Sequence, residues 1–234
     1  MPQGFDILLE DGPALVVCKP PGVATQAPTG IDSLETRIRD FIRQREAKTG
    51  NFYLGIPHRL DRPASGAIVF ARHVRAAQRL ARQFEARTVR KIYWAAVAGV
   101  VEPAEGVWTD HLWKVYGQPR AQVVEPTHPG AQHAVLRYRT LGRHEHGSLL
   151  EIELETGRTH QVRVQAASRG HAVLGDELYG SPLTWGEQYE DWRLRAIALH
   201  ARELEFDHPM RRERVRVVAP APTAWREALA RAGL

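Results

Sequence analysis

The irregular order of strand-like and helix-like segments is the feature that most constrains the fold of this chain. Short apolar runs bounded by Gly and Pro predict strands, beginning with Phe5–Leu9 and Ala14–Cys18, which are joined by a turn. Apolar residues spaced three or four apart predict helices instead. Strands and helices do not alternate regularly, so we expect an α+β fold with a mixed, largely antiparallel central sheet flanked by helices, not a doubly wound sheet. The further predicted strands are Ala67–Phe70, Lys91–Ala98, Ala134–Leu141, Ser148–Leu154, Ile197–Phe206 and Val215–Val218, and the predicted helices are 33–47, 73–86, 159–169 and 223–231.

The ends of the predicted helices carry recognisable capping residues. Asp32 or Ser33 is suited to cap the first helix, and Thr223 the last. The segment Glu102–Gln132 is rich in Pro, Gly and isolated aromatic residues, so we expect loops and short strands there. A chain of 234 residues is long enough for one domain. The sequence predicts a single domain over residues 1–234, with 100–133 as the place where two lobes would meet.

Several protein classes are excluded by simple features. The longest apolar stretch, Tyr93–Val101, is far shorter than the ~20 residues of a membrane helix. The first residues show no basic segment followed by an apolar one, so no secretory signal is apparent. Cys18 is the single cysteine, which excludes an internal disulfide and a cysteine zinc site, and its apolar strand predicts an inert core residue. A cytoplasmic location is the simplest expectation.

The charge balance points towards nucleic acid. The chain has 32 Lys and Arg against 27 Asp and Glu, and 28 of the basic residues are arginines. Arginine matches phosphate geometry and stacks on bases, so this bias suits an RNA or DNA partner. The alternative is a mixed-charge surface encoded by a GC-rich genome.

The segment 58–66, His-Arg-Leu-Asp-Arg-Pro-Ala-Ser-Gly, is the first candidate for chemistry. Its Pro and Gly predict a loop that holds Asp61 between Arg59 and Arg62. A carboxylate kept ionised in a basic setting can be a nucleophile, a base or a metal ligand. The alternative is that Asp61 closes a turn and both arginines are surface charges.

The segment 155–163, Glu-Thr-Gly-Arg-Thr-His-Gln-Val-Arg, is the second candidate. We expect Thr159 to cap a helix that ends before a left-handed Gly170. Its first turns would carry Arg158, His160 and Arg163, a suitable site for phosphate or carboxylate because helix N-termini attract anions. Ordinary capping with solvated charges is the alternative.

Two further segments are less specific. The glycine-rich segment 170–180 lacks the Gly-Lys-Ser/Thr of a phosphate-binding P-loop, so we expect a structural turn with Asp176 as an internal cap. In Lys91–Trp94, alternation places Lys91 and Tyr93 on one strand face. Tyr93 then serves either as a core residue or as a stacking platform or proton carrier.

The histidines do not form a recognisable metal motif. The chain has 11, and none shows the helical spacing of zinc ligands, so we expect no functional metal. A metal-dependent nuclease or phosphoesterase using His58, Asp61 and Asp176 remains an alternative hypothesis.

Taken in order, these segments resemble the RluA-type family of RNA pseudouridine synthases. The similarity starts at Val17–Gly22, continues through 58–66, Lys91–Tyr93 and 155–180, and ends with Leu199–Ala201, Asp207–Pro209 and Ala219-Pro220. It covers about residues 5 to 222. Five motifs in the same order are far more specific than any one of them. The small N-terminal RNA-binding domain of many relatives is not expected, because the similarity starts close to Met1.

The resemblance implies a fold, a reaction and a site. It implies the pseudouridine synthase fold with a basic active-site cleft, and isomerisation of uridine in structured rRNA or tRNA without a cofactor. The family's aspartate corresponds to Asp61, its tyrosine to Tyr93 and the charge partner of the aspartate to Arg163. RNA contacts are expected from Arg59, which would help displace the target base, and from Arg62, Lys91, Arg158 and His160. A monomer with no obligate protein partner is expected.

The sequence departs from the family pattern at two places. Ala64 stands where the family usually has threonine, and Gln165-Ala166 stands where a His-Leu pair is common. Neither replaces a residue that the resemblance places in the chemistry. A catalytically silent RNA-binding protein of the same fold is the remaining alternative, and the intact Asp61, Tyr93 and Arg163 argue against it.

Overall fold

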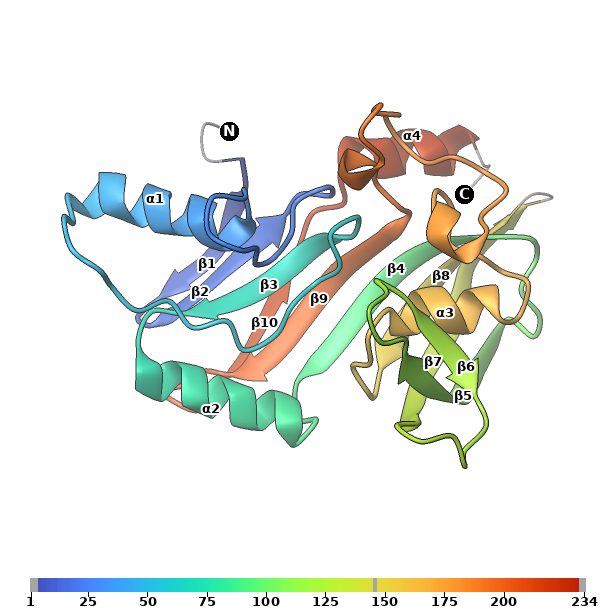
Figure 1. Cartoon of the computed structure of the whole chain (residues 1–234), viewed down its shortest axis with the longest axis horizontal. Helices are drawn as coiled ribbons and strands as arrows, with labels where there is room; N and C mark the ends of the chain where they lie inside the picture. The colour runs from blue at the N-terminus through green and yellow to red at the C-terminus, as the bar shows by residue number, and fades with distance from the viewer. Residues whose placement is uncertain (1–3, 145–146, 232–234) are drawn as a thin grey trace. The chain divides into compact units, whose positions relative to one another are not determined.

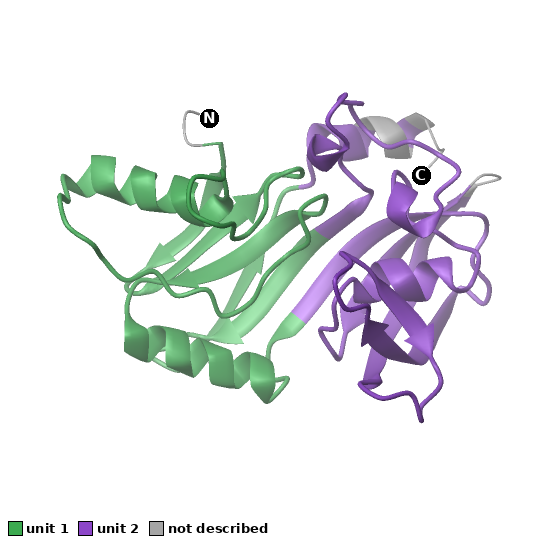
Figure 2. Ribbon diagram, in the orientation of Figure 1, with its two compact units in different colours: residues 1–90, 201–220 green, residues 91–200, 221–234 purple. Residues whose placement is uncertain are grey.

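The computed structural model describes residues 4–144 and 147–231, which form two compact units (Figure 2). Unit 1 contains the described residues up to 90 together with 201–220. Unit 2 contains the described residues of 91–200 together with those from 221 onwards. The first boundary therefore lies before the segment 100–133 suggested by the sequence. A single catalytic domain over residues 1–234 stays a prediction.

The strands of unit 1 are arranged in the order β1-β2-β3-β9, with β10 paired to β9 (Figure 1). These strands are β1 (Asp6–Asp11), β2 (Ala14–Lys19), β3 (Ser65–Ala71), β9 (Leu199–Asp207, in this unit from 201) and β10 (Arg214–Val218). The pairs β1–β2, β2–β3 and β9–β10 are antiparallel. All five strands coincide closely with runs predicted from apolar patterning.

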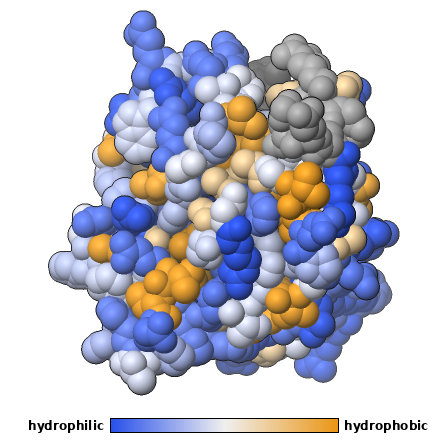
Figure 3. All heavy atoms as spheres, turned by 90° about the vertical axis from the view of Figure 1, so that its right-hand side faces the viewer, coloured by the Kyte–Doolittle hydropathy of each residue, from blue (hydrophilic) through white to orange (hydrophobic). Residues whose placement is uncertain are grey.

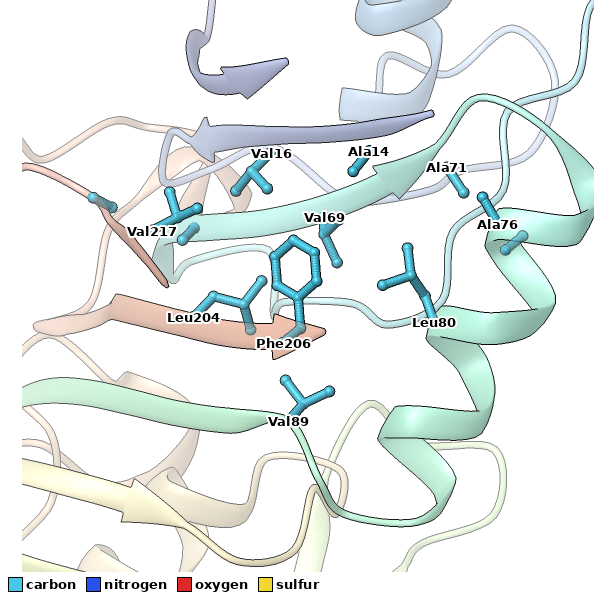
Figure 4. Packing of buried hydrophobic residues seen from close by; sticks show 13 residues of the cluster. Ala14, Val16, Val69, Ala71, Ala76, Leu80, Val89, Leu204, Phe206 and Val217 are labelled. Carbon is cyan, nitrogen blue, oxygen red and sulfur yellow. The ribbon is translucent and has the colours of Figure 1, made fainter. Parts of the chain in front are cut away.

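One face of these strands forms a hydrophobic core with helix α2 (Val74–Glu85). Alternate residues of β3 point to this face, and Phe206 of β9 lies beside Leu80 of α2 (Figure 4). Phe206 and Leu80 are both fully buried, and burial of such a side chain stabilises a fold by about 1.5–3 kcal/mol. The helix forms because its small and apolar residues recur at helical spacing: Ala76, Ala77 and Leu80 are its buried residues.

Helix α1 (Leu34–Glu46) lies on the opposite side of these strands from α2 (Figure 1). Ser33 caps it by accepting a hydrogen bond from the Thr36 amide, and the Thr36 side chain accepts one from the Ser33 amide. The helix ends at Ala47 in the left-handed region, with φ of 49°. The predicted helix and one of the two predicted caps are thus confirmed. Its buried residues are Leu34, Ile38 and Ile42.

Unit 2 contains the strand order β4-β8-β7-β5-β6, and every neighbouring pair in it is antiparallel. These strands are β4 (Arg90–Ala98, in this unit from Lys91), β5 (Glu105–Lys114), β6 (Ala121–Val124), β7 (Gln132–His144) and β8 (Gly147–Leu154). The expectation of loops and short strands over 102–132 is wrong for β5, which has ten residues. Only Trp108 and Leu112 of β5 are fully buried, so its apolar alternation is weak. Hydrogen bonding to a strand on each side stabilises it instead.

The helical elements of unit 2 are short. They are α3 (Gln161–Ala167), the 3₁₀ turns η1 (Glu177–Tyr179) and η2 (Trp192–Leu194), and α4 (Thr223–Arg231). Val164 of α3 packs against Leu112, Ala121 and Ala134 of three strands. In α4, Trp225 is buried, with the rings of Trp94, Trp185 and His200 at centroid distances of 6.4, 5.1 and 6.1 Å. The chain is therefore an α+β protein with a mixed, mostly antiparallel strand arrangement, as predicted.

Among residues 4–144 and 147–231, no helix is both long and apolar enough to cross a bilayer. The face drawn in Figure 3 is largely hydrophilic, and its hydrophobic groups are separated by polar ones.

Candidate active site

The predicted reactive carboxylate, Asp61, lies on the loop that leads into β3. Asp61 is half-buried, whereas Leu60 before it is buried and Arg59 is exposed. Arg62 is half-buried. Gly66, the second residue of β3, has φ of 117°. A Cβ at this position would lie 2.3 Å from the carbonyl oxygen of Ala201, which is too close. Glycine is therefore required where β3 meets β9 directly after the loop.

The residue before Asp61 is held by a buried threonine. The Thr25 hydroxyl donates to the Leu60 carbonyl at 3.0 Å and accepts from the Leu60 amide at 3.1 Å. Thr25 is only 4% exposed, so both bonds are shielded from water. One side chain thus fixes both backbone polar groups of the residue next to Asp61.

The residue after Asp61 is held from the segment that follows β2. The amide of Gly22 donates to the carbonyl of Arg62 at 2.9 Å, and Lys19 Nζ donates to the same carbonyl at 3.0 Å. Lys19 Nζ also donates to the carbonyls of Pro20 and Val23, at 2.9 and 2.8 Å. The loop is therefore fixed on both sides of Asp61 by residues 19–25.

Lys19 is a buried lysine that the sequence analysis did not single out as functional. It is 0% exposed, and its three N–H groups match the three carbonyls that surround it. Burial lowers the pKa of Lys19 to about 7, and the attraction of the Asp61 carboxylate opposes this shift. A positive charge that attracts the Asp61 carboxylate is thus available, and it is sensitive to pH near neutrality.

His58, the first residue of the segment 58–66, contacts β3 and α2. Its Nε2 accepts a hydrogen bond from the Val69 amide at 3.1 Å, and its ring stacks on Phe84 of α2 with centroids 4.3 Å apart. Accepting that bond requires Nε2 to be unprotonated, and it occupies the lone pair of this nitrogen. The structure therefore gives His58 a structural role in positioning the loop.

Cys18, whose pKa burial raises to about 11, packs beside the core as the expected inert thiol.

In unit 2, the segment 155–163 is organised by Gln161 and not by Thr159. The predicted Thr159 cap is wrong, because α3 starts at Gln161 and its N-cap is His160, in the left-handed region with φ of 54°. Gln161 Oε1 accepts from the Arg158 amide at 3.0 Å and from Thr156 Oγ1 at 2.7 Å. A side-chain amide inside the helix therefore replaces the cap that the sequence suggested. Gly170 has the expected left-handed conformation, with φ of 81°, but α3 already ends at Ala167, with Ser168 as its C-cap.

Arg163 forms a buried, two-pronged ion pair with Asp176. Its Nε and Nη2 donate to the two carboxylate oxygens at 2.6 and 2.8 Å, and both side chains are at most 5% exposed. The prediction that Asp176 is an internal cap is wrong, because its side chain makes no cap bond. Two other acidic residues of these segments pair elsewhere: Glu155 with Arg137, and Glu177 with Arg195. Asp176 thus fixes the guanidinium of Arg163 in one orientation.

Tyr179 ties the other side chains of this segment to the sheet. Its hydroxyl lies 2.9 Å from His160 Nδ1 and accepts from the Ala121 amide at 2.8 Å. The Arg163 guanidinium lies over its ring, 5.1 Å from the centroid. His160 and Arg163, both predicted as site residues, therefore share one tyrosine as a neighbour.

Unit 2 also contains three other predicted site residues, Lys91, Tyr93 and Arg158. Lys91 and Tyr93 are half-buried on β4, and Tyr93 lies opposite Ile152 of β8. A Cβ at Gly157 would lie 3.9 Å from Lys91 Nζ, so the end of this lysine lies beside the 155–163 segment. Arg158 Nε donates to the carbonyl of His133 at 2.9 Å. The structure thus brings Lys91 and the second candidate segment together.

The residues that depart from the family pattern have structural explanations. Ala64 is buried, and its amide donates to the Asp61 carbonyl at 3.1 Å, so the turn closes without a threonine hydroxyl. Gln165 is fully buried and donates to the Trp108 carbonyl at 3.2 Å and to the Asp110 carboxylate at 2.6 Å. It therefore joins α3 to β5 through polar bonds.

Comparison with known proteins identifies the family of this chain. The model of the family described as RNA pseudouridylate synthase matches residues 13–168. The chain is 35% identical to the uncharacterized RNA pseudouridine synthase YhcT of Bacillus subtilis over 220 residues, which cover 93% of this chain and 69% of that protein. It belongs to the RNA pseudouridylate synthase family.

Relatives with more specific names are similarly close. The chain is 34% identical to ribosomal large subunit pseudouridine synthase D of Neisseria meningitidis serogroup B, over 94% of this chain and 59% of the relative. The structure named human RNA pseudouridylate synthase domain containing 4 superposes with a TM-score of 0.78, covering 97% of this chain and 93% of that one at 24% identity. This RNA pseudouridine synthase therefore also has the fold expected of its family, and it is an isomerase.

The sequence analysis missed the residues of this synthase that position others. Thr25, Gln161 and Tyr179 hold the two candidate segments, and Asp176 orients Arg163. A lysine that ends an apolar strand and precedes Pro-Pro-Gly was the available signal for Lys19. No local pattern marks Thr25 or Asp176 as a partner, because each acts on a residue far away in the sequence. Over the described residues, no group of three or more His, Cys, Asp or Glu is placed to hold a metal ion.

Proposed function

We propose that this protein converts specific uridines of structured rRNA or tRNA to pseudouridine, with Asp61 as the reacting carboxylate. The observation that carries the proposal is the fixation of both neighbours of Asp61: Thr25 holds Leu60, and Lys19 with Gly22 holds Arg62. A carboxylate that must meet one atom of an extruded nucleotide benefits from a backbone fixed before the substrate arrives. A loop with only a solvated turn aspartate needs no such fixation.

The reaction rearranges bonds without a net change in composition. The bond between uracil N1 and ribose C1′ breaks, a bond between C5 and C1′ forms, C5 loses a proton and N1 gains one. No redox change or energy input is needed, so we propose that no cofactor takes part. Asp61 acts by attacking the ribose, by attacking the base, or by assisting formation of a glycal. All three routes need an ionised carboxylate.

Tyr93 and Arg163 complete the proposed catalytic set. Tyr93 stacks on the flipped uracil, and its hydroxyl moves the C5 proton. Arg163 serves as the charge partner of Asp61. The two hydrogen bonds that Arg163 donates to Asp176 support this role, since they hold the guanidinium in a fixed orientation. Family membership supports the assignment of all three residues.

The proposed substrate is RNA bound through a basic cleft. Arg59, which is exposed, displaces the target base, and the extrusion costs a few kcal/mol, which contacts to the flanking RNA offset. Further RNA contacts come from Arg62, Lys91, Arg158 and His160. The name of the Neisseria relative supports ribosomal RNA over transfer RNA. We propose that the enzyme works in the cytoplasm as a monomer without an obligate protein partner.

Mapping of pseudouridine tests this function directly. Total RNA from a strain lacking the protein should lose pseudouridine at one or a few sites, and the wild-type chain should restore them. Asp61→Asn should restore none, because the amide cannot act as an anion, although its RNA affinity should stay within about three-fold, since affinity depends mainly on phosphate contacts. Full restoration by Asp61→Asn would refute the role of Asp61.

The same assay separates the alternatives. A catalytically silent RNA-binding protein would leave the pseudouridine map of the deletion strain unchanged. A metal-dependent nuclease would cleave RNA in vitro and lose that activity with a chelator, whereas the proposed isomerisation should be unaffected.

A further inference from the structure

Helix α2 and the turn between β9 and β10 present a cluster of arginines in unit 1. Arg75, Arg79 and Arg82 follow one another at helical spacing, so they lie on one face of α2. Arg212 of the turn belongs to the same cluster, since its charge acts on Arg79 together with those of Arg75 and Arg82. These four residues are named here the α2 arginine surface.

The α2 arginine surface has no ion-pair partner among the described residues. Nearby arginines are paired: Arg72 with Glu10 and Glu46, Arg211 with Asp11, and Arg214 with Glu205. None of the ion pairs formed by residues 4–144 and 147–231 includes Arg75, Arg79, Arg82 or Arg212. The one acidic residue of α2 is Glu85, at its last position. The cluster is therefore a local excess of positive charge.

This excess is unfavourable for the folded protein by itself. The pKa of Arg79 is lowered by burial and then by the charges of Arg75, Arg212 and Arg82. Arg75 also lies in the first turn of α2, where the helix dipole disfavours a cation, and that turn contains no acidic residue. Arg212 adopts a left-handed backbone conformation, with φ of 65°, that favours glycine. An anionic partner bound to these arginines would turn this net repulsion into net attraction.

The two elements that carry the cluster are joined rigidly. Arg79 Nη1 donates to the carbonyl of Pro209 at 2.6 Å. Gln83 donates to the carbonyl of Asp207 and accepts from its amide, both at 2.8 Å. The two elements, and the Arg79 guanidinium between them, are thus held in place before any ligand binds, which lowers the entropic cost of binding.

We propose that the α2 arginine surface binds the phosphate backbone of the RNA substrate, at a position separate from the residues that meet the target uridine. The inference rests on the proposed function, because a structured RNA is the polyanion that this enzyme would meet. From Arg75 to Arg82 the helix rises about 10 Å, and a nucleic-acid duplex carries one charge in each ~1.7 Å of its axis. Several phosphates therefore fit along the surface at once.

The same helix supports the catalytic loop. Phe84 of α2 stacks on His58, three residues before Asp61. RNA held on the arginine face of α2 is therefore held on a helix that packs against the start of the segment containing Asp61. Binding there would fix the register of the RNA without contacting the base that reacts.

A triple variant, Arg75→Gln, Arg82→Gln and Arg212→Gln, tests the proposal. Glutamine keeps helix propensity, and Arg79 is retained because it anchors the Pro209 carbonyl. The matched control is Arg43→Gln, Arg139→Gln and Arg193→Gln, which removes the same net charge from arginines paired with Asp40, Glu151 and Asp191. Binding of a structured rRNA fragment is measured over a range of salt, and the single-turnover rate is measured at saturating RNA.

We expect the triple variant to weaken RNA binding at least about ten-fold at low salt and to reduce the log–log salt slope by about 2 to 3. Its rate at saturating RNA should equal that of the wild type, and the control should bind within about three-fold of the wild type. Equal affinities and slopes for the triple variant and the control would overturn the proposal. The proposal would also be overturned if the triple variant lost binding to vesicles of phosphatidylcholine and phosphatidylglycerol while its RNA binding was unchanged. That result would favour a membrane surface as the partner.

Two further readouts keep the outcomes distinct. If the wild type binds RNA through this surface but forms no pseudouridine, the proposed function fails and the surface stands. If thermal melting shows that the triple variant is unfolded, Arg75→Gln with Arg212→Gly serves instead, since glycine relieves the left-handed position. This double variant should reduce the salt slope by about 2, and an unchanged slope would refute the surface.

Discussion

Replacing Thr25 by valine removes the hydroxyl that holds the residue before Asp61 and keeps the shape of the side chain. The Thr25 hydroxyl forms two buried bonds, one to the carbonyl and one from the amide of Leu60. Valine can form neither, so both backbone groups lose their partner while the cavity stays filled. The substitution thus isolates the anchoring of the Asp61 loop.

The size of the effect follows from these two bonds. A buried hydrogen bond contributes about 1 kcal/mol, and a buried group left unsatisfied costs about 1–3 kcal/mol. We expect Thr25→Val to lower the free energy of unfolding by about 2–4 kcal/mol. A displaced carboxylate should also lower the single-turnover rate at least about ten-fold, which corresponds to about 1.4 kcal/mol in the barrier.

Urea unfolding and single-turnover kinetics measure the two effects separately. Thr25→Ser is the matched control, since it keeps the hydroxyl and loses only a methyl group. We expect it to keep the wild-type rate within about three-fold and most of the stability. RNA affinity should stay near the wild-type value for both variants, because neither changes a charge.

Two results would refute this reasoning. If Thr25→Val unfolds at the wild-type urea concentration, the hydrogen bonds to Leu60 do not stabilise the loop. If it loses stability but keeps the wild-type rate, the loop anchor has no role in catalysis, and the observation that carries the proposed function loses its force.

Three other substitutions have equally definite outcomes. Tyr93→Phe should lower the single-turnover rate at least about 100-fold with unchanged RNA affinity, because stacking survives and proton transfer does not; an unchanged rate would reduce Tyr93 to a packing role. Asp176→Asn should lower the free energy of unfolding by about 3–5 kcal/mol, because it weakens the buried pair with Arg163; calorimetry checks this, and a loss under about 1 kcal/mol would contradict it. Burial lowers the pKa of Lys19 to about 7, so above that pH the unfolded chain holds a proton that the folded chain has released. The unfolding free energy of the wild type should therefore rise with pH between about 7 and 10, by up to about 1.4 kcal/mol per unit, relative to Lys19→Met. Parallel pH profiles in urea would show that Lys19 stays charged.

The sequence located the candidate segments but not the contacts that organise them. Asp61 on a loop before β3, and Lys91 with Tyr93 on β4, lie in the elements that apolar patterning predicted. Thr159 failed as a cap because Gln161, inside the helix, satisfies the preceding amide of Arg158. The pairing of Asp61 with Arg163 stays a prediction, and the proposed site residues await the experiments above.

What the sequence by itself determined is everything that depends on neighbours within a few residues. Apolar periodicity predicted α1, α2 and most strands, because an amphipathic segment can bury its apolar residues in only one secondary structure. Tertiary structure alone decided β5, whose weak alternation is offset by hydrogen bonds to β6 and β7. It also decided that Lys19 is buried beneath the Asp61 loop and that Asp176 binds Arg163. These outcomes depend on the burial and charge of groups distant in sequence, and the free energy of a buried charge is set by the partners that folding brings to it.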